Sequence, residues 1–294
     1  MNNKKIFAVV GLLMMSIIWG VNLPYMKVAL NFSGPAEFTF LRNFFGAMVL
    51  FVILLILRKP ILIKEAPKLF ILGLFQTAGF TGFIVWALVE GGASKTGVLT
   101  FTMPLWVALM AWPLLQERLT SSQWVSVLIC VLGIGFIFNP LNIDNNFRSA
   151  FLAIAAGFSW AIGTIISKRI HRKYPKMDLL TMTAWQMLWG SIPILLIILF
   201  MGAQPILWTP YFLNIILFNV VFVNAIAYLL WFYALKHLEA SLVSILALFT
   251  PISAAISAWF LLDEVPNSFE KIGFSLILSG IFLLLLYKSK EKLS

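Results

Sequence analysis

Charged residues are scarce in this sequence. Asp, Glu, Lys and Arg make up 11% of its 294 residues, whereas hydrophobic residues make up 61%. Soluble globular domains carry about a quarter charged residues and about half apolar ones. A soluble domain is therefore excluded as the main unit, and the composition predicts an integral membrane protein surrounded by membrane lipid.

Residues that carry catalytic or metal chemistry are also few. There is one cysteine, Cys130, in an apolar segment, so the chain supports neither a disulfide framework nor a thiolate metal site. The two histidines, His171 and His237, are far apart in the sequence. The sequence contains no GxxxxGK[ST] phosphate loop and no glycine-flanked serine elbow. We therefore expect no enzyme, no ATP-driven pump, no catalytic residue, no metal and no cofactor.

Acidic residues are outnumbered by basic ones, 11 to 21, which gives a net charge of +10. The basic residues cluster in alternate connecting segments rather than on one domain, which argues against a nucleic-acid partner. A cytoplasmic N-terminus puts most of them on the inner side, as the positive-inside rule requires. These inner residues are Lys4, Lys5, Arg58, Lys59, Lys64, Lys68, Arg118, Lys168, Arg169, Arg172, Lys173, Lys176, Lys236, Lys288, Lys290 and Lys292. We expect a multi-pass protein of the cell (inner) membrane with both termini cytoplasmic.

Long apolar runs occur along the whole chain. A helix needs roughly 20 such residues to cross the hydrocarbon core, and the runs are continuous rather than alternating, which favours helices over a barrel. The predicted fold class is an all-α integral membrane protein with ten transmembrane helices. We expect the spans at 6–30, 35–57, 68–88, 94–115, 122–139, 149–168, 178–201, 211–235, 240–262 and 270–287.

An internal repeat relates the two halves of the chain. Residues 93–134 align without a gap on residues 240–281 at an offset of 147, and 13 of these 42 positions are identical, among them Pro104 and Pro251. This similarity indicates a duplication into residues 1–145 and 146–294. Because each half holds five expected spans, an odd number, the second must run inverted through the membrane. Inverted repeats are typical of secondary transporters, whose site lies near the midplane between the repeats.

The motifs point to a known family. The opening WGVNLPYMK, the FLRN sequence at 40–43, and two copies of ASxxxxLxxxxPxxxxxxAWxLLxE resemble the drug/metabolite transporter superfamily and, within it, the ten-helix EamA type. The resemblance implies two inverted five-helix repeats that move small metabolites, commonly outward, by alternating access. Members handle amino acids, sugars and other compounds, so the resemblance does not identify the substrate.

We predict a secondary transporter, an exporter of small polar metabolites such as amino acids. One alternative is a proton-coupled exporter of cationic drugs, which needs an ionisable acid in the site. Glu90 is the only acid in mid-chain that fits that role, and it lies near the end of a span. A channel is the third alternative. The substrate, the direction, the coupling ion and the oligomeric state stay open at this point.

Polar and aromatic residues inside the spans are the candidates for substrate binding. Several recur at helical spacing, and in the third span one such stripe is formed by Gln76, Gly79, Phe83, Trp86 and Glu90. Lipid cannot satisfy polar atoms, so such stripes should face the bundle interior. Each also has a structural alternative: packing for the amides, interfacial anchoring for the tryptophans, and snorkelling for Glu90 and Lys168. The candidates are Trp19, Asn22, Lys27, Arg42, Gln76, Trp86, Glu90, Trp160, Thr164, Gln186, Asn224, Tyr228 and Trp231.

Two charges and two prolines have more specific predicted roles. Lys27 and Arg42 lie near the outer ends of the first two spans, with Glu37 as the one nearby acid. We hypothesise that they bind the anionic end of the substrate, with snorkelling of Lys27 as the alternative. Pro104 and Pro251 occupy equivalent positions of the two halves, and each removes a backbone donor from its helix. They are the predicted gating residues, and ordinary tolerated prolines are the alternative.

Overall fold

The computed structural model describes residues 3–61, 65–91, 93–117, 120–138, 147–262, 265 and 268–290, and these residues form helices and no strands. Seven helical stretches are long and apolar enough to cross a membrane. They are Asn3–Ala29, Pro35–Ile56, Ala66–Val89, Phe147–Lys173, Leu179–Met201, Pro210–His237 and Leu242–Leu261, with shorter apolar helices at Met103–Leu115, Trp124–Phe136 and Lys271–Gly280. The all-helical membrane class predicted from the composition is confirmed.

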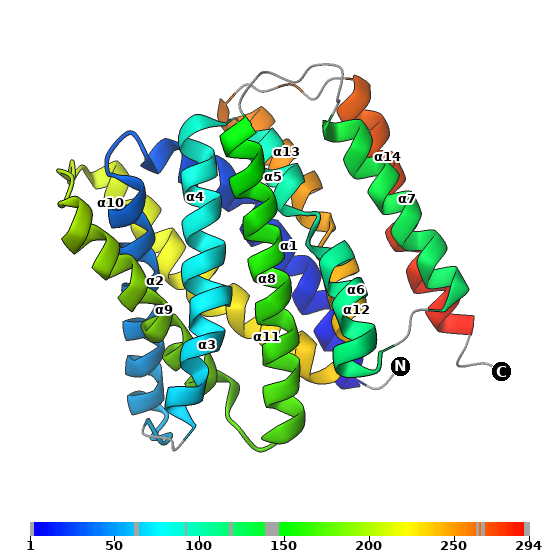
Figure 1. The fold of residues 1–294 in the computed structure, drawn as a ribbon, viewed down its shortest axis with the longest axis horizontal. Coiled ribbons are helices and arrows are strands. Elements are labelled where there is room, and N and C mark those ends of the chain that lie inside the picture. The colour runs from blue at the N-terminus through cyan, green and yellow to red at the C-terminus, as the bar shows by residue number, and fades with distance from the viewer. Residues whose placement is uncertain are drawn as a thin grey trace.

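The helical elements pack side by side into one bundle (Figure 1). In chain order they are α1 (Asn3–Ala29), α2 (Pro35–Ile56), η1 (Ala66–Lys68), α3 (Leu69–Gly73), η2 (Leu74–Gly79), α4 (Phe80–Glu90), α5 (Ala93–Thr100), α6 (Met103–Leu115), α7 (Ser121–Phe138), α8 (Phe147–Lys173), α9 (Leu179–Met201), α10 (Pro210–Phe218), η4 (Asn219–Ile226), α11 (Ala227–His237), α12 (Ala240–Leu246), α13 (Phe249–Leu262) and α14 (Ser268–Lys290).

Helix boundaries follow the local sequence. Pro35 occupies the first turn of α2, where the missing N–H costs nothing. Asp178 and Thr209 precede α9 and α10, and their side-chain oxygens accept hydrogen bonds from the backbone N–H groups of the first turn. Helix α6 ends at Leu115 and is followed by Gln116, whose φ of 58° lies in the left-handed region.

Two apolar helices are broken at equivalent positions. A turn at Phe101 and Thr102 separates α5 from α6, and a turn at Ala247 and Leu248 separates α12 from α13. Pro104 lies in the first turn of α6, and Pro251 lies in that of α13. Each proline therefore follows a break rather than kinking a continuous helix, because its missing N–H and its ring suit the start of a new helix.

Two π-helical segments also lie at equivalent positions. Segment η2 joins α3 to α4, and η4 joins α10 to α11. A π-helical turn takes up more residues than an α-helical one, so residues beyond it are rotated relative to simple α-helical spacing. Faces deduced by counting threes and fours across these segments are therefore displaced.

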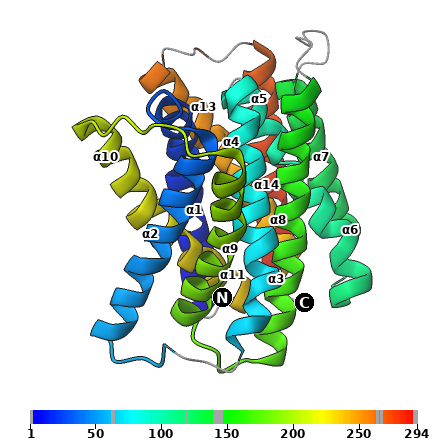
Figure 2. The ribbon, with the colours of Figure 1, turned by 60° about the vertical axis from the view of Figure 1, so that its left-hand side comes forward.

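Helices α1 and α8 run in opposite directions through the bundle. The Oγ of Ser149, near the start of α8, donates to the carbonyl of Ala87, while Lys27, near the end of α1, reaches the carbonyl of Leu88. Helix α8 therefore begins at the end of the bundle where α1 finishes, as Figures 1 and 2 show. At one edge, α7 and α14 pack along each other in opposite directions (Figure 1).

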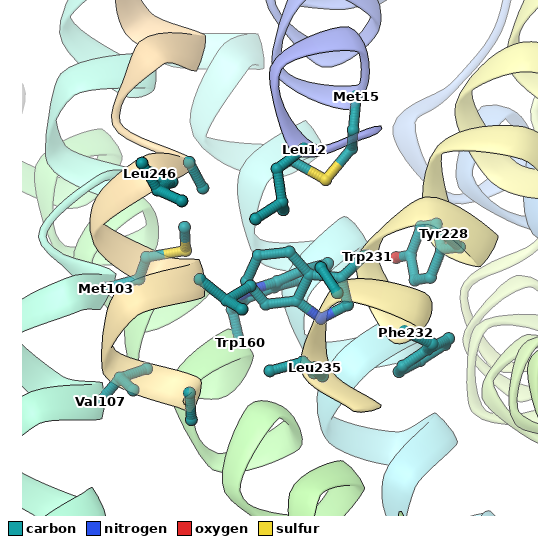
Figure 3. Packing of buried hydrophobic residues seen from close by; sticks show 14 of the residues in the cluster. Leu12, Met15, Met103, Val107, Trp160, Tyr228, Trp231, Phe232, Leu235 and Leu246 are labelled. Atoms are coloured by element: carbon teal, nitrogen blue, oxygen red, sulfur yellow. The ribbon is translucent and has the colours of Figure 1, made fainter. Parts of the chain in front are cut away.

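The buried apolar residues form two main clusters. The larger surrounds Trp160 and Trp231 and includes Leu12 and Met15 from α1 and Leu246 from α12 (Figure 3). The second lies toward the end of α1 and includes Leu23, Met26, Phe38, Val85 and Phe212. Residues of both clusters line a central cavity, among them Trp160 and Met103 of the larger cluster and Leu23 and Met26 of the second.

Candidate functional site

A central cavity of about 40 Å³ lies inside the bundle. It is lined from both halves of the chain by Trp19, Asn22, Leu23, Met26, Arg42, Phe80, Ile84, Thr100, Phe101, Met103, Trp160, Val223, Tyr228 and Thr250. A water molecule occupies about 10–15 Å³ on this scale, so the cavity holds about three waters in this conformation. A metabolite larger than that needs the surrounding helices to move apart.

The helix that carries Trp19 and Asn22 is held tightly against the broken helix α12–α13. A Cβ added to Gly20 would lie 2.7 Å from the backbone nitrogen of Ala254, so only glycine fits at this contact. The hydroxyl of Ser253 donates to the carbonyl of Ser16 at 2.8 Å, and that of Ser257 donates to the carbonyl of Gly20. These contacts fix the wall of the cavity that α1 supplies.

Arg42 is the charged residue of the cavity lining, and its side chain is buried, with 3% exposure. Its Nη2 donates to Asn224 Oδ1 at 3.1 Å, its Nη1 lies 3.1 Å from Met26 Sδ, and the guanidinium lies over the ring of Phe38. Glu37, the acid predicted nearby, instead accepts from the backbone N–H of Gln204 at 2.7 Å. Among the described residues no carboxylate forms an ion pair with Arg42.

Several polar atoms of the lining have no hydrogen-bond partner among the described residues. They are the Nε of Arg42, the Nε1 of Trp160, the Oγ1 of Thr250 and the Oδ1 of Asn22. Buried polar groups are normally paired, so a group left unpaired inside a cavity calls for a ligand or water to complete it. These unpaired atoms offer hydrogen-bond donors next to the positive charge of Arg42, and the amide oxygen of Asn22 offers an acceptor.

Aromatic rings form the rest of the wall. The rings of Trp19 and Trp160 meet edge to face at 5.0 Å, and Tyr228 lies 5.6 Å from Trp19 and 5.7 Å from Trp160. The indole of Trp19 donates to the carbonyl of Val223, and the hydroxyl of Tyr228 donates to the carbonyl of Gln76. These rings present apolar faces to a ligand, while backbone groups hold the polar tips of Trp19 and Tyr228 and leave the Nε1–H of Trp160 unpaired.

Lys27 does not line the cavity, although it was predicted to bind substrate with Arg42. Its Nζ donates to the carbonyls of Leu88 and Gly91 at 2.6 and 2.9 Å, at the end of α4. A cation is favourable there because the last carbonyls of a helix lack partners and carry partial negative charge. Lys168 does the same at the end of α11, where its Nζ donates to Leu235 and Leu238.

The other predicted residues are placed as follows. Asn224 is buried beside the cavity and holds Arg42, and Trp231 packs behind Trp160 at 5.0 Å. Gln186 accepts from Thr77, and Thr164 donates to the carbonyl of Trp160, one turn earlier on the same helix. Gln76 is buried and Trp86 is half-buried, and neither lines the cavity. The side chain of Glu90, at the end of α4, lies outside the described residues.

The stripe predicted on the third span does not form one wall. Phe83, which helical spacing aligned with Gln76, is 39% exposed, whereas Gln76 is fully buried. The π-helical segment η2 includes Gln76 and Gly79, so counting through it rotates the later residues onto another face. Phe80 and Ile84, which the counting left out, are the residues of α4 that line the cavity.

Residues beside the two helix breaks also line the cavity and were not predicted. They are Thr100, Phe101 and Met103 at the first break and Thr250 at the second. Met103 and Thr250 are 147 positions apart, the offset of the repeat. The signal was present in the sequence, because the repeated prolines mark both breaks and these residues directly precede them.

Comparison with known proteins agrees with this architecture. The model of the EamA-like transporter family matches residues 6–139 and again residues 147–286. A Bacillus subtilis protein described as an uncharacterized transporter, YoaV, is 30% identical over 93% of this chain and 94% of its own length. A Salmonella typhimurium protein described as a probable amino-acid metabolite efflux pump is 27% identical over 92% of each chain.

A solved crystal structure superposes on 96% of this chain with a TM-score of 0.80 at 17% identity, covering 98% of that structure. At this identity the likeness concerns the fold alone. The helices define a multi-pass membrane protein of a transporter class. The chain belongs to the EamA-like transporter family, which confirms the resemblance drawn from its motifs.

Proposed function

We propose that the protein is a secondary transporter that exports small metabolites with an anionic group, amino acids among them, by alternating access. The observation that carries this proposal is the buried guanidinium of Arg42 in the wall of the central cavity, without a carboxylate partner among the described residues. A buried charge is costly unless it is paired. A substrate carboxylate supplies the missing negative charge, and the fork of an arginine suits its two oxygens.

The remaining lining supports the same class of ligand. The unpaired Nε1–H of Trp160 and the hydroxyl of Thr250 can donate to substrate oxygens, and Asn22 Oδ1 can accept from an ammonium or hydroxyl group. The rings of Trp19, Trp160 and Tyr228 suit an apolar remainder. A relative described as a probable amino-acid metabolite efflux pump supports export of such compounds.

Export of cationic drugs fits the cavity less well. A proton-coupled site for cations needs an acid that alternates between proton and drug, but the lining contains no Asp or Glu among the described residues. A fixed positive charge at Arg42 repels a cation instead. A channel is disfavoured because the cavity is small and lies between two apolar clusters.

We also propose that the chain is built from two inverted five-span repeats, residues 1–145 and 146–294, in the cell (inner) membrane with both termini cytoplasmic. Support comes from the two family matches, from the opposite directions of α1 and α8, and from the paired π-helical segments and helix breaks. The basic residues of alternate connecting segments favour this orientation.

Labelling tests the repeat and its orientation together. In a variant without Cys130, cysteines at the exposed residues Asn31 and Ala203 should react with an impermeant maleimide from outside the cell. Cysteines at Lys173 and Lys236 should react only after the membrane is opened. Labelling of Asn31 and Ala203 from opposite sides would contradict the inverted arrangement.

Counterflow in proteoliposomes tests the transported class. Vesicles preloaded with one compound should accumulate radiolabelled amino acids or other small carboxylates, and not radiolabelled quaternary amines. Arg42→Gln should reduce this uptake strongly at substrate concentrations near the dissociation constant of the unchanged protein. Arg42→Lys, which keeps the charge and loses the fork, should retain part of it. Preference for quaternary amines, or full activity of Arg42→Gln, would reject the proposal.

A further inference from the structure

A second and larger cavity lies at the opposite end of α1 from Lys27. Its volume is about 640 Å³, against about 40 Å³ for the central cavity. The ends of α8 and α11 form much of its wall, and Lys5 of α1 and Glu117 after α6 complete it. We call it the basic cavity. None of the residues that line it lines the central cavity.

The basic cavity contains a buried histidine without a hydrogen-bond partner. His171 is 7% exposed, and neither Nδ1 nor Nε2 has a partner among the described residues. Its ring meets Phe232 edge to face, so packing fixes the imidazole although its polar atoms are unused. The other histidine of the chain, His237, also lines this cavity, and its Nδ1 lies 2.8 Å from the carbonyl of Tyr233. His171 is therefore the unpaired imidazole of this wall.

The charged groups around His171 are mainly basic. The lining contains two more cationic side chains than carboxylates. The cations are Lys5, Lys168, Arg172 and Lys236, and the carboxylates are Glu117 and Glu239. The Glu117 carboxylate already accepts from Arg172 at 2.6 Å and from the backbone N–H of Ala240 at 2.9 Å. Lys168 covers the terminal carbonyls of α11, which removes the partial negative charge that would oppose an anion.

The same two helices connect the basic cavity to the central one. Helix α8 carries Trp160 at the central cavity and His171 at the basic cavity. Helix α11 carries Tyr228 at the central cavity and Leu235 at the basic cavity. Between them lies the layer of Trp160, Trp231 and Leu235 shown in Figure 3. A ligand that leaves the basic cavity along these helices reaches the central cavity once this apolar layer parts.

We propose that the basic cavity is a second binding site, specific for an anionic group such as a carboxylate or a phosphate. His171 donates a hydrogen bond to the anion, and the ammonium groups of Lys5 and Lys236 supply the opposite charge. A neutral imidazole has one donor nitrogen, so this role does not require a charged histidine. That the anion is the leading end of a transported metabolite rests on the function proposed above; the anion site itself does not.

Nuclear magnetic resonance of histidine tests this site directly, because the chain contains only His171 and His237. The purified protein in detergent, labelled with carbon-13 at histidine Cε1, gives two ring signals, and His237→Gln assigns them. Sodium phosphate and sodium acetate are titrated separately at constant pH, with sodium chloride at matched ionic strength as the control. The His171 signal should shift saturably with at least one of the two anions, which also separates phosphoryl from carboxylate ligands.

A double variant, Lys5→Gln with Lys236→Gln, provides the second measurement at exposed positions where folding is not at risk. The apparent affinity of the anion should fall by about fivefold, as expected for loss of two exposed charge contacts. Arg42→Gln should leave the His171 titration unchanged. A linear response, an equal response to chloride, or an unaltered affinity in the double variant would overturn the site. Loss of transport in Arg42→Gln with no His171 response would reject this site and leave the proposed function standing.

Discussion

The two halves of the chain share a framework and differ in the chemistry they bring to the cavity. Each has a π-helical segment, a helix broken before a proline, and a lysine that covers the end of a helix. Arg42 of α2 holds Asn224, and in the other half Gln186 of α9 holds Thr77 at 2.7 Å. Only the first of these contacts includes a charge, and only Arg42 of the four lines the central cavity. The shared features build the scaffold, whereas substrate recognition is concentrated on one side of it.

The largest expected difference between the halves concerns substrate affinity. Removing one member of a buried, hydrogen-bonded charge pair costs about 2–5 kcal/mol, so Arg42→Gln should weaken binding of a carboxylate substrate by about thirtyfold or more. Gln186→Met, a near-isosteric change at the corresponding contact, should leave affinity within about twofold, since Gln186 does not line the cavity. Equilibrium binding of a radiolabelled substrate identified by counterflow measures both. Equal losses in the two variants would show that recognition is shared by the halves.

The next difference concerns two glycines that allow these contacts. A Cβ on Gly190 would lie 2.4 Å from the Cβ of Thr77 and 2.6 Å from the carbonyl of Gly73, whereas a Cβ on Gly46 meets the Cβ of Asn224 at 2.8 Å. Overpacking costs about 1–3 kcal/mol, and a backbone carbonyl cannot rotate away, so Gly190→Ala should be near the upper end and Gly46→Ala near the lower. Unfolding midpoints in detergent give the comparison. A larger decrease of the unfolding midpoint in Gly46→Ala than in Gly190→Ala would contradict this prediction.

The two lysines should behave alike in both halves. Lys27→Met and Lys168→Met each leave two helix-terminal carbonyls without their ammonium donor, at a cost of about 1–3 kcal/mol in unfolding free energy. Because Lys27 does not line the central cavity, substrate affinity should stay unchanged in a Lys27→Met protein that remains folded. A drop in affinity without a drop in thermal stability would return Lys27 to the anion-binding role first hypothesised for it.

The smallest expected effect is at the start of α9. Burial raises the pKa of Asp178, but the hydrogen bond from Lys59 and those from the N–H groups of Thr181 and Leu180 outweigh it, so the pKa is lowered overall. A lowered carboxyl pKa stabilises the fold above the unfolded value, and this contribution disappears as pH falls through the folded value. Asp178→Ala should lower the unfolding free energy by about 1 kcal/mol at neutral pH. It should also make the decrease of stability at acid pH less steep, which unfolding measured over a range of pH values would show. If stability decreases at acid pH as steeply in Asp178→Ala as in the unchanged protein, groups other than Asp178 cause that decrease.

Helix α10 is capped by an uncharged side chain, because the hydroxyl oxygen of Thr209 accepts from the backbone N–H of Phe212. Thr209→Ala therefore serves as the matched control, since it removes an N-cap without removing a titratable group. The decrease in its stability at acid pH should match that of the unchanged protein, whatever its effect on overall stability.

Composition was sufficient for the membrane class, the motifs for the family, and the polar and aromatic residues within the spans for several of the cavity residues. Trp19, Asn22, Arg42, Trp160 and Tyr228 were predicted to bind substrate, and they meet at one cavity. The counting of polar stripes failed on the third span because a π-helical segment interrupts it, and no residue type marks such a segment reliably.

The position of Lys27 could not be deduced from its own helix. Its partners are carbonyls at the end of α4, more than 60 residues away, and a carbonyl has no signature in the sequence. Thr250 and Met103 could have been found, because they directly flank the repeated prolines. What the sequence hides is therefore backbone geometry rather than side-chain chemistry.

The buried guanidinium of Arg42 has an electrical consequence. Arginine stays protonated in proteins, so the unloaded cavity carries a positive charge, and a bound carboxylate cancels it. Carrying one elementary charge across 100 mV changes the energy by about 2.3 kcal/mol. If alternating access moves this site through part of the membrane field, voltage acts on the return of the empty carrier differently from the passage of the loaded one, and the membrane potential then helps to set the turnover rate.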